Sequence, residues 1–264
     1  MGARAIILPC DAPLATLDTL LDSVNGVLFT GGSLENLTFD SPYMVAAAHV
    51  FKRVLEKNNA GTYFPLHGTC QGFQVLSLLV AQDQSVLAYN AFDSEGLVIP
   101  LDISWDGHHS SRIFSAITAP DSVVNTLGSL NTTINLHHDG VPVSTFEANQ
   151  NLTGFFVLVS TNFDRVEKAF VSTVEAWDYP ITATQWHPER NAGEWRDTIA
   201  SSAHSAEAID AVLYIASYFV GGARRNAQVF ADTALFTKYS VFSYPLVGSS
   251  DVGSSGYQWV VFSE

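Results

Sequence analysis

Short apolar runs alternate with helical patterns along the first part of the chain. Residues 5–8 and 26–29 are continuously apolar, which is typical of strands in a parallel sheet covered on both faces. Between them, apolar residues recur at helical spacing over residues 14–24, and a second helical stripe follows over residues 42–55. A further buried strand is expected over residues 63–66. This β-α-β-α alternation predicts an α/β fold.

The second half of the chain contains more strand-like segments, separated by Gly, Asn and Pro. The apolar runs predict strands over residues 86–101, 155–160, 170–175, 181–186 and 257–262, and a helix over residues 209–219 that stops at Gly221-Gly222. No linker separates two parts. We therefore predict one domain over residues 1–264, with a doubly wound, mostly parallel central sheet flanked by helices.

Composition narrows the functional classes. Hydrophobic residues make up 47% and charged residues 14%, which is typical of a compact globular chain. The formal net charge of −14 argues against a nucleic-acid partner, because phosphate binding needs clustered Lys and Arg. The longest apolar runs are too short to span a bilayer, so we expect no membrane partner. No metal-ligand spacing of Cys and His stands out, and we predict neither a metal nor a cofactor.

Cys70 lies in the segment Gly-Thr-Cys-Gln-Gly of residues 68–72, directly between a predicted strand and a predicted helix. Small neighbours allow the tight, strained turn that exposes a nucleophile at such a junction. The positive end of the helix dipole also favours a thiolate there. We therefore predict that Cys70 is a nucleophile and that the N–H of Gln71 faces a developing oxyanion. The alternative is a buried core cysteine.

Gly31 and Gly32 directly follow the strand predicted over residues 26–29. In an open parallel sheet, sites lie beyond the carboxyl ends of strands. Glycine lets the backbone approach a ligand closely, so an N–H from Gly31 or Gly32 could complete an oxyanion hole. An ordinary turn is the alternative.

His187 follows another predicted strand, within the motif Gln-Trp-His-Pro-Glu of residues 185–189. Pro188 holds the segment extended, so that His187 and Glu189 project to the same side. A carboxylate beside an imidazole holds its tautomer and stabilises its charged form. Cys70, His187 and Glu189 thus form a candidate nucleophile, general base and supporting carboxylate.

The two motifs, at residues 68–74 and 185–189, resemble the paired motifs of class I glutamine amidotransferase-like proteins, which have a flavodoxin-like fold. More narrowly, the chain resembles the gamma-glutamyl hydrolase, or folylpolyglutamate hydrolase, family. The matching segments are residues 25–33, residues 63–70 with His67 in place of the usual tryptophan, residues 171–191, and Glu194-Trp195. The likeness runs from about residue 3 to the end of the chain.

The resemblance implies a small-molecule substrate, a poly-gamma-glutamyl chain that is typically on a folate, hydrolysed at its amide bonds through a thioester. It implies Cys70 as the nucleophile and His187 as the base. His137 falls where the family places an active-site histidine, with His138 as a rival and a plain loop histidine as the alternative. Arg190 could supply the positive charge that a polyanionic tail requires.

The resemblance also implies a cellular compartment and a longer N-terminal part of the fold. Many family members work in vacuoles, lysosomes or outside the cell, and sequons at Asn36, Asn131 and Asn151 hint weakly at the secretory route, although no signal peptide is visible. Family members carry a strand and helix before the segment that residue 3 matches. We therefore expect a sheet without these elements and a chain that is poorly soluble or weakly active alone.

Two other functions stay open at this point. One is a free-standing glutaminase of the amidotransferase-like class that hands ammonia to a synthase. The other is an inactive, N-terminally truncated remnant, which the intact Cys70, His187 and Glu189 oppose. Endo- or exo-cleavage and a homodimer are left open by the sequence.

Overall fold

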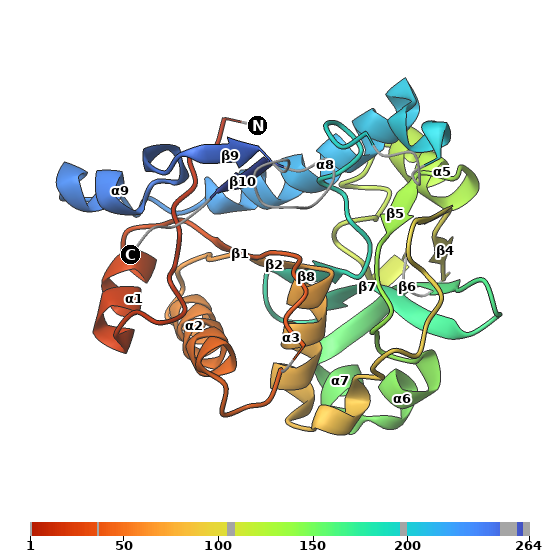
Figure 1. Cartoon of the computed structure of the whole chain (residues 1–264), viewed down its shortest axis with the longest axis horizontal. Helices are drawn as coiled ribbons and strands as arrows, with labels where there is room; N and C mark the ends of the chain where they lie inside the picture. The colour runs from red at the N-terminus through yellow and green to blue at the C-terminus, as the bar shows by residue number, and fades with distance from the viewer. Residues whose placement is uncertain (1, 36, 105–108, 196–199, 249–257, 261–264) are drawn as a thin grey trace.

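The computed structural model describes residues 2–35, 37–104, 109–195, 200–248 and 258–260. Six strands form the central sheet in the order β1-β2-β8-β7-β6-β4 (Figure 1). They are β1 (Val27–Phe29), β2 (Leu66–Thr69), β4 (Asp102–Ile103), β6 (Phe156–Phe163), β7 (Ala169–Ala176) and β8 (Ile181–Thr184). Strands β1, β2 and β8 are parallel, whereas β7, β6 and β4 pair antiparallel. The α/β class is confirmed, and the sheet is mixed rather than mostly parallel.

Helices cover both faces of this sheet. They are α1 (Leu14–Leu21), α2 (Pro42–Asn59), α3 (Gln71–Ala81), α5 (Asp121–Ser129), α6 (Val143–Ala148), α7 (Gln150–Phe155), α8 (Ala206–Ala223) and α9 (Thr233–Tyr239). Figure 1 shows α2 and α3 on one face and α8 on the other. Two small sheets lie outside the central one: β3 (Leu97–Ile99) pairs with β5 (Thr133–Asn135), and β9 (Leu246–Gly248) with β10 (Gln258–Val260).

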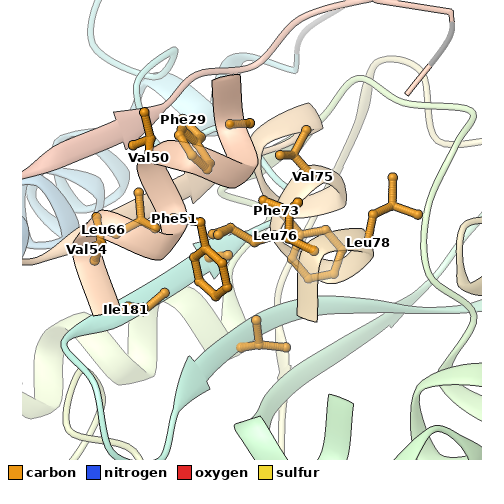
Figure 2. Close-up of a cluster of buried hydrophobic side chains, with 14 of the residues drawn as sticks. Phe29, Val50, Phe51, Val54, Leu66, Phe73, Val75, Leu76, Leu78 and Ile181 are labelled. Carbon is orange, nitrogen blue, oxygen red and sulfur yellow. The ribbon is translucent and has the colours of Figure 1, made fainter. Parts of the chain in front are cut away.

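A large apolar cluster fixes α2 and α3 on the parallel strands (Figure 2). Phe73 and Leu76 of α3, Leu66 of β2 and Ile181 of β8 are fully buried, and Phe51 of α2 packs beside them. Burying each large side chain contributes about 1.5–3 kcal/mol. The packing therefore holds the N-terminus of α3 at the carboxyl ends of β2 and β8.

A second cluster fills the opposite face. It joins Leu127 of α5, Val159 of β6, Trp186, and Val212 and Ile215 of α8. By length and mean hydropathy alone, the 18 residues of α8 could cross a membrane. In this fold α8 adds Val212 and Ile215 to that cluster, and 22% of its 18 residues are buried.

The apolar run at residues 5–8 does not enter the sheet, contrary to the strand predicted there. Ile6 forms an isolated antiparallel bridge with Ser240, and the N–H of Ile7 donates to the carbonyl of Tyr239 at 2.8 Å. Within the described residues, β1 is thus the edge of the sheet, and Leu28 is 49% exposed. A short apolar run predicts extended backbone, but it does not determine which strand the segment pairs with.

Other boundaries also differ from the pattern. Residues 86–101 contain only β3 as a strand, because Asn90 and Gly96 have positive φ angles (49° and 68°) that interrupt extended backbone. The strand expected over residues 63–66 begins at Leu66. Helix α8 continues through the two glycines to Ala223. Of the strand predicted over residues 257–262, the described part is β10, and the rest lies outside the described residues.

Candidate active site

The predicted site residues meet at the carboxyl ends of the three parallel strands. Cys70 directly follows β2, and Gly31 comes two residues after β1. His187 lies three residues after the end of β8. The order β1-β2-β8 therefore places Cys70 on the central strand, with the other two segments on either side.

Cys70 occupies a strained backbone position, with φ 51° and ψ −107°. A non-glycine residue rarely adopts a positive φ, and such strain persists only where the surroundings hold it. The N–H of Cys70 donates to the carbonyl of Thr184 at 2.7 Å, and the Cys70 carbonyl accepts from the N–H of Gln74 at 3.1 Å. The side chain is buried, at 4% exposure. This is the predicted sharp turn from strand into helix.

Two glycines make this turn sterically feasible. A Cβ on Gly72 would lie 2.1 Å from the carbonyl oxygen of Phe29, and one on Gly68 would lie 2.7 Å from the carbonyl oxygen of Gly72. The backbone of α3 thus touches both β1 and β2, and no larger residue fits at either position.

His187 is held between Cys70 and Glu189. Its Nδ1 lies 2.6 Å from Oε1 of Glu189, and its backbone N–H donates to the carbonyl of Ile134 at 2.8 Å. Burial alone would lower the pKa of His187, but hydrogen bonds to Cys70 and Glu189 outweigh it and raise that pKa to about 9. The charged form of the ring is thus favoured by its two acidic neighbours, Cys70 and Glu189. Burial opposes ionisation of Glu189, yet the hydrogen bond to His187 keeps its pKa below the usual value.

Arg190 lies on the outer side of this pair. Its Nε is 3.1 Å from Nδ1 of His187 and 3.7 Å from Oε1 of Glu189, and its Nη1 pairs with Glu194. Because the Nδ1–H of a charged imidazole donates to Glu189, Arg190 is a neighbouring cation of the ring and not its donor. Two carboxylates thus share the charge of Arg190, and its role toward a polyanionic tail stays a prediction.

The loop after β1 lies directly against the cysteine and the histidine. A Cβ on Gly31 would lie 2.9 Å from Cε1 of His187 and 3.6 Å from Cβ of Cys70. The amide side chain of Gln71 clamps this loop, because it donates to the carbonyl of Leu34 at 2.9 Å and accepts from its N–H at 3.3 Å. A Cβ on Gly32 would meet the same amide at 2.5 Å. Gly31, Gly32 and Gln71 therefore form one wall of the site.

Of the two adjacent histidines, only His137 is buried. It is 5% exposed, its Nδ1 lies 3.0 Å from the carbonyl oxygen of Asp139, and its ring packs edge-on against Phe170. Burial, with a smaller contribution from His187, lowers the pKa of His137 to about 3. His137 is thus neutral, with the proton on Nδ1. Nδ1 of His138 lies near the carbonyl oxygen of Phe92 instead.

The family model described as Peptidase C26 matches residues 1–189. The chain belongs to the peptidase C26 family. It is 36% identical to gamma-glutamyl hydrolase 1 of Arabidopsis thaliana over 85% of this chain and 62% of that protein. It is 32% identical to gamma-glutamyl hydrolase of Mus musculus, over 96% of this chain and 77% of that protein. The family resemblance predicted from the motifs is confirmed.

This peptidase C26 chain spans less than two thirds of the length of the Arabidopsis relative. The human gamma-glutamyl hydrolase is 31% identical over 96% of this chain and 76% of its own length. Among solved structures, a glutamine amidotransferase of Thermotoga maritima aligns with 80% of this chain and 76% of its own, at a TM-score of 0.37 and 13% identity.

The sequence did not point to two linked amides, one of which contacts the peptidase C26 cysteine. Nε2 of Gln185 lies 3.6 Å from Sγ of Cys70, and Gln74 bonds to Gln185 from α3. The available signal was the first position of the 185–189 motif, a polar residue at the end of an otherwise buried strand. Among the described residues, no group of three or more His, Cys, Asp or Glu side chains could hold a metal ion.

Proposed function

We propose that this protein is a cysteine hydrolase that cleaves gamma-glutamyl amide bonds of poly-gamma-glutamates, with folylpoly-gamma-glutamates as the expected substrate. One observation carries the proposal: Cys70, on a strained turn, is hydrogen-bonded to a charged His187 whose other nitrogen is bound by Glu189. The relatives from Arabidopsis, mouse and human are all gamma-glutamyl hydrolases, which favours this activity over a glutaminase.

In the first half of the reaction, the Cys70 thiolate attacks the carbonyl carbon of the gamma-glutamyl amide. The carbonyl electrons move onto oxygen, and N–H groups of Gln71 and of Gly31 or Gly32 stabilise that oxyanion. Gln71 is the first residue of α3, and N–H groups in the first turn have no intrahelical partner. The intermediate collapses to a thioester as His187 gives its Nε2 proton to the departing amine nitrogen.

In the second half, neutral His187 takes a proton from water, and the resulting hydroxide attacks the thioester carbon. The second tetrahedral intermediate expels the Cys70 thiolate and leaves a free gamma-carboxylate. The imidazolium that forms is stabilised by Glu189, which restores the starting charge pair.

His137 is proposed to contact the substrate. Its Nδ1–H is used on the Asp139 carbonyl, so Nε2 carries a lone pair. Among the described residues, that buried Nε2 has no hydrogen-bond partner. A substrate N–H would supply one, because a neutral imidazole nitrogen accepts and does not donate.

The proposed setting is a vacuole, a lysosome or the outside of the cell, which rests on the family resemblance. In an acidic compartment, protonation of histidines and the start of carboxylate titration would reduce the net charge of −14 that repels a polyanionic substrate.

One experiment tests the function directly. The protein is incubated separately with folyl-pentaglutamate and with free glutamine, and the products are identified by mass. We expect shortened folates and released glutamate or glutamyl peptides from the first, and little ammonia from the second. Cys70→Ala should abolish cleavage, whereas Cys10→Ala, at an exposed free thiol, should leave it nearly intact. Cleavage that survives in Cys70→Ala, or turnover of glutamine alone, would overturn the proposal.

A further inference from the structure

Two buried glutamine amides are hydrogen-bonded to each other, one of them contacts the sulfur of Cys70, and neither has a part in the reaction described above. Gln185 is 0% and Gln74 is 4% exposed. Gln185 directly follows β8, whereas Gln74 lies in the first turn of α3, four residues after Cys70. Two elements that converge on the nucleophile thus each contribute one amide.

One backbone carbonyl determines how both amides are oriented. The side chain of Gln74 lies 2.9 Å from the carbonyl oxygen of Asp139. A carbonyl only accepts, so the Gln74 atom facing it is the nitrogen. The same nitrogen lies 3.3 Å from Gln185, whose facing atom must therefore be the oxygen Oε1. It follows that Gln185 turns its Nε2 toward Cys70, at 3.6 Å from Sγ.

An N–H donor beside Sγ stabilises the thiolate form of Cys70 more than the thiol form. A hydrogen bond to an ionised acceptor is stronger than one to a neutral acceptor, and a buried anion needs such partners. Sγ of Cys70 is buried, with imidazolium His187 on one side and Nε2 of Gln185 on another.

We propose that Gln185 is a positioning residue that stabilises the Cys70 thiolate through its Nε2–H, and that Gln74 holds the Gln185 amide in the required orientation. This inference rests on the proposed role of Cys70 as the nucleophile. Gln185 does not touch the reacting carbonyl; it acts through the sulfur.

The test measures the thiolate without any substrate. In a Cys10→Ala background, Cys70 is the only cysteine, and its rate of alkylation by iodoacetamide is followed from pH 4 to 10. Gln185→Met keeps the size of the side chain but removes the donor. We expect the pH of half-maximal rate to rise by about one unit, with about tenfold slower alkylation at low pH. Gln74→Met removes the hydrogen bond that orients the Gln185 amide but keeps the Gln185 donor, so it should give a smaller shift in the same direction.

Gln82→Met provides the matched control, because it makes the same change on an exposed residue at the far end of α3. Its profile should overlay that of the parent. A residue that served packing alone would lower the thermal midpoint without moving the profile, so an unmoved profile in a folded Gln185→Met overturns the proposal. If Gln185→Met shows no cooperative thermal transition, Gln185→Glu decides instead: its carboxylate faces the sulfur and should move the profile further upward, and no movement refutes the role.

The two proposals fail separately. A shifted profile in a protein that does not cleave folyl-pentaglutamate would uphold the positioning role and refute the substrate. An active hydrolase whose Gln185→Met profile is unmoved would refute the positioning role alone.

Discussion

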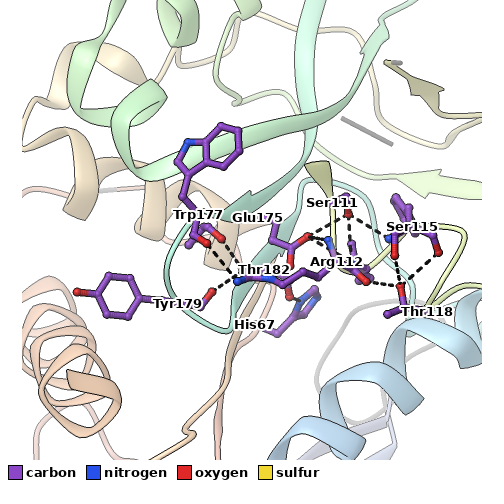
Figure 3. A network of polar contacts seen from close by, with 12 residues as sticks. His67, Ser111, Arg112, Ser115, Thr118, Glu175, Trp177, Tyr179 and Thr182 are labelled. Atoms are coloured by element: carbon purple, nitrogen blue, oxygen red, sulfur yellow. Dashed lines mark hydrogen bonds and ion pairs between the residues drawn. The ribbon is translucent and has the colours of Figure 1, made fainter. Parts of the chain in front are cut away.

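The central sheet holds two polar clusters that differ in how completely their polar atoms are hydrogen-bonded. Around Glu175 on β7, every polar atom of the carboxylate is matched: it accepts hydrogen bonds from Oγ of Ser111, from N and Nε of Arg112 and from N of Ile113, at 2.7–3.2 Å (Figure 3). Arg112 also donates to the carbonyls of Ala176, Trp177 and Tyr179. This cluster fastens the segment around Arg112 to the strand end.

The Cys70 cluster instead keeps strain and unmatched groups. Its backbone has a positive φ, its helix N-terminus presents N–H groups with no intrahelical partner, and Nε2 of His137 has no partner among the described residues. Both oxygens of Glu175 are thus hydrogen-bonded, whereas a neutral imidazole nitrogen and a strained backbone lie at the Cys70 site; we expect the first cluster to serve stability and the second to serve the proposed reaction. Substitutions in the two clusters should therefore separate activity from stability.

The largest effect is expected at His187. His187→Asn should lower kcat/KM by about 10²–10⁴-fold or more, because it removes the proton donor and acceptor of both half-reactions. The thermal midpoint should fall only moderately, because the Glu189 side chain left without its partner is 52% exposed and can be hydrated. Steady-state kinetics on folyl-pentaglutamate, with a thermal melt of the same sample, measure both quantities. A rate within a few-fold of the parent would remove His187 from the mechanism.

Glu175→Gln should lower stability much more than activity. Removing one partner of a buried ion pair destabilises strongly, and because the Arg112 side chain is 45% exposed we expect a loss of about 2–4 kcal/mol in the free energy of unfolding. Activity per folded molecule should stay within a few-fold of the parent. Urea titration measures the loss, and Glu147→Gln, at an exposed carboxylate, is the control. An activity defect without a stability defect would contradict the structural assignment of this cluster.

Glu189→Gln should have a moderate effect that depends on pH. The hydrogen bond to Glu189 is one cause of the raised pKa of His187, about 9. Activity that needs the imidazolium falls as pH rises through that value, so the alkaline limb of kcat/KM should move to lower pH in the variant. Glu95→Gln, at another exposed carboxylate, should leave the limb in place. An unmoved limb in Glu189→Gln would show that Glu189 does not support the charge.

The smallest effect concerns His67, which bonds to Thr182 in the row of side chains next to Glu175. Burial lowers its pKa from 6.5 to about 4. Between these values the unfolded chain binds a proton that the folded chain does not, so stability should fall as pH drops from about 6.5 to about 4. His67→Gln removes this titration and should flatten that part of the stability profile. Urea midpoints measured at several pH values test the slope, and an unchanged slope would contradict the lowered pKa.

Local patterns predicted the parts of the molecule that depend on local chemistry. Residues 68–72 form the expected turn from strand into helix, because only glycine fits at positions 68 and 72. The placement of the run at residues 5–8 was not predictable, because its partner Ser240 lies more than 230 residues away. The Gln74–Gln185 contact was missed for the same reason, since it joins side chains from different elements.

Gly72 determines how closely β1 and α3 approach each other, because it has no side chain. Its α-carbon lies against the carbonyl of Phe29, where a single added methyl group would be 2.1 Å from the oxygen. Its lack of a side chain therefore lets the backbone of α3, which begins beside Cys70, contact the backbone of β1, which leads to Gly31. A side chain added there would push β1 and α3 apart. We therefore expect a larger residue at position 72 to change the spacing between Gly31 and Gln71, the proposed oxyanion donors, although it lies two residues along the chain from Cys70.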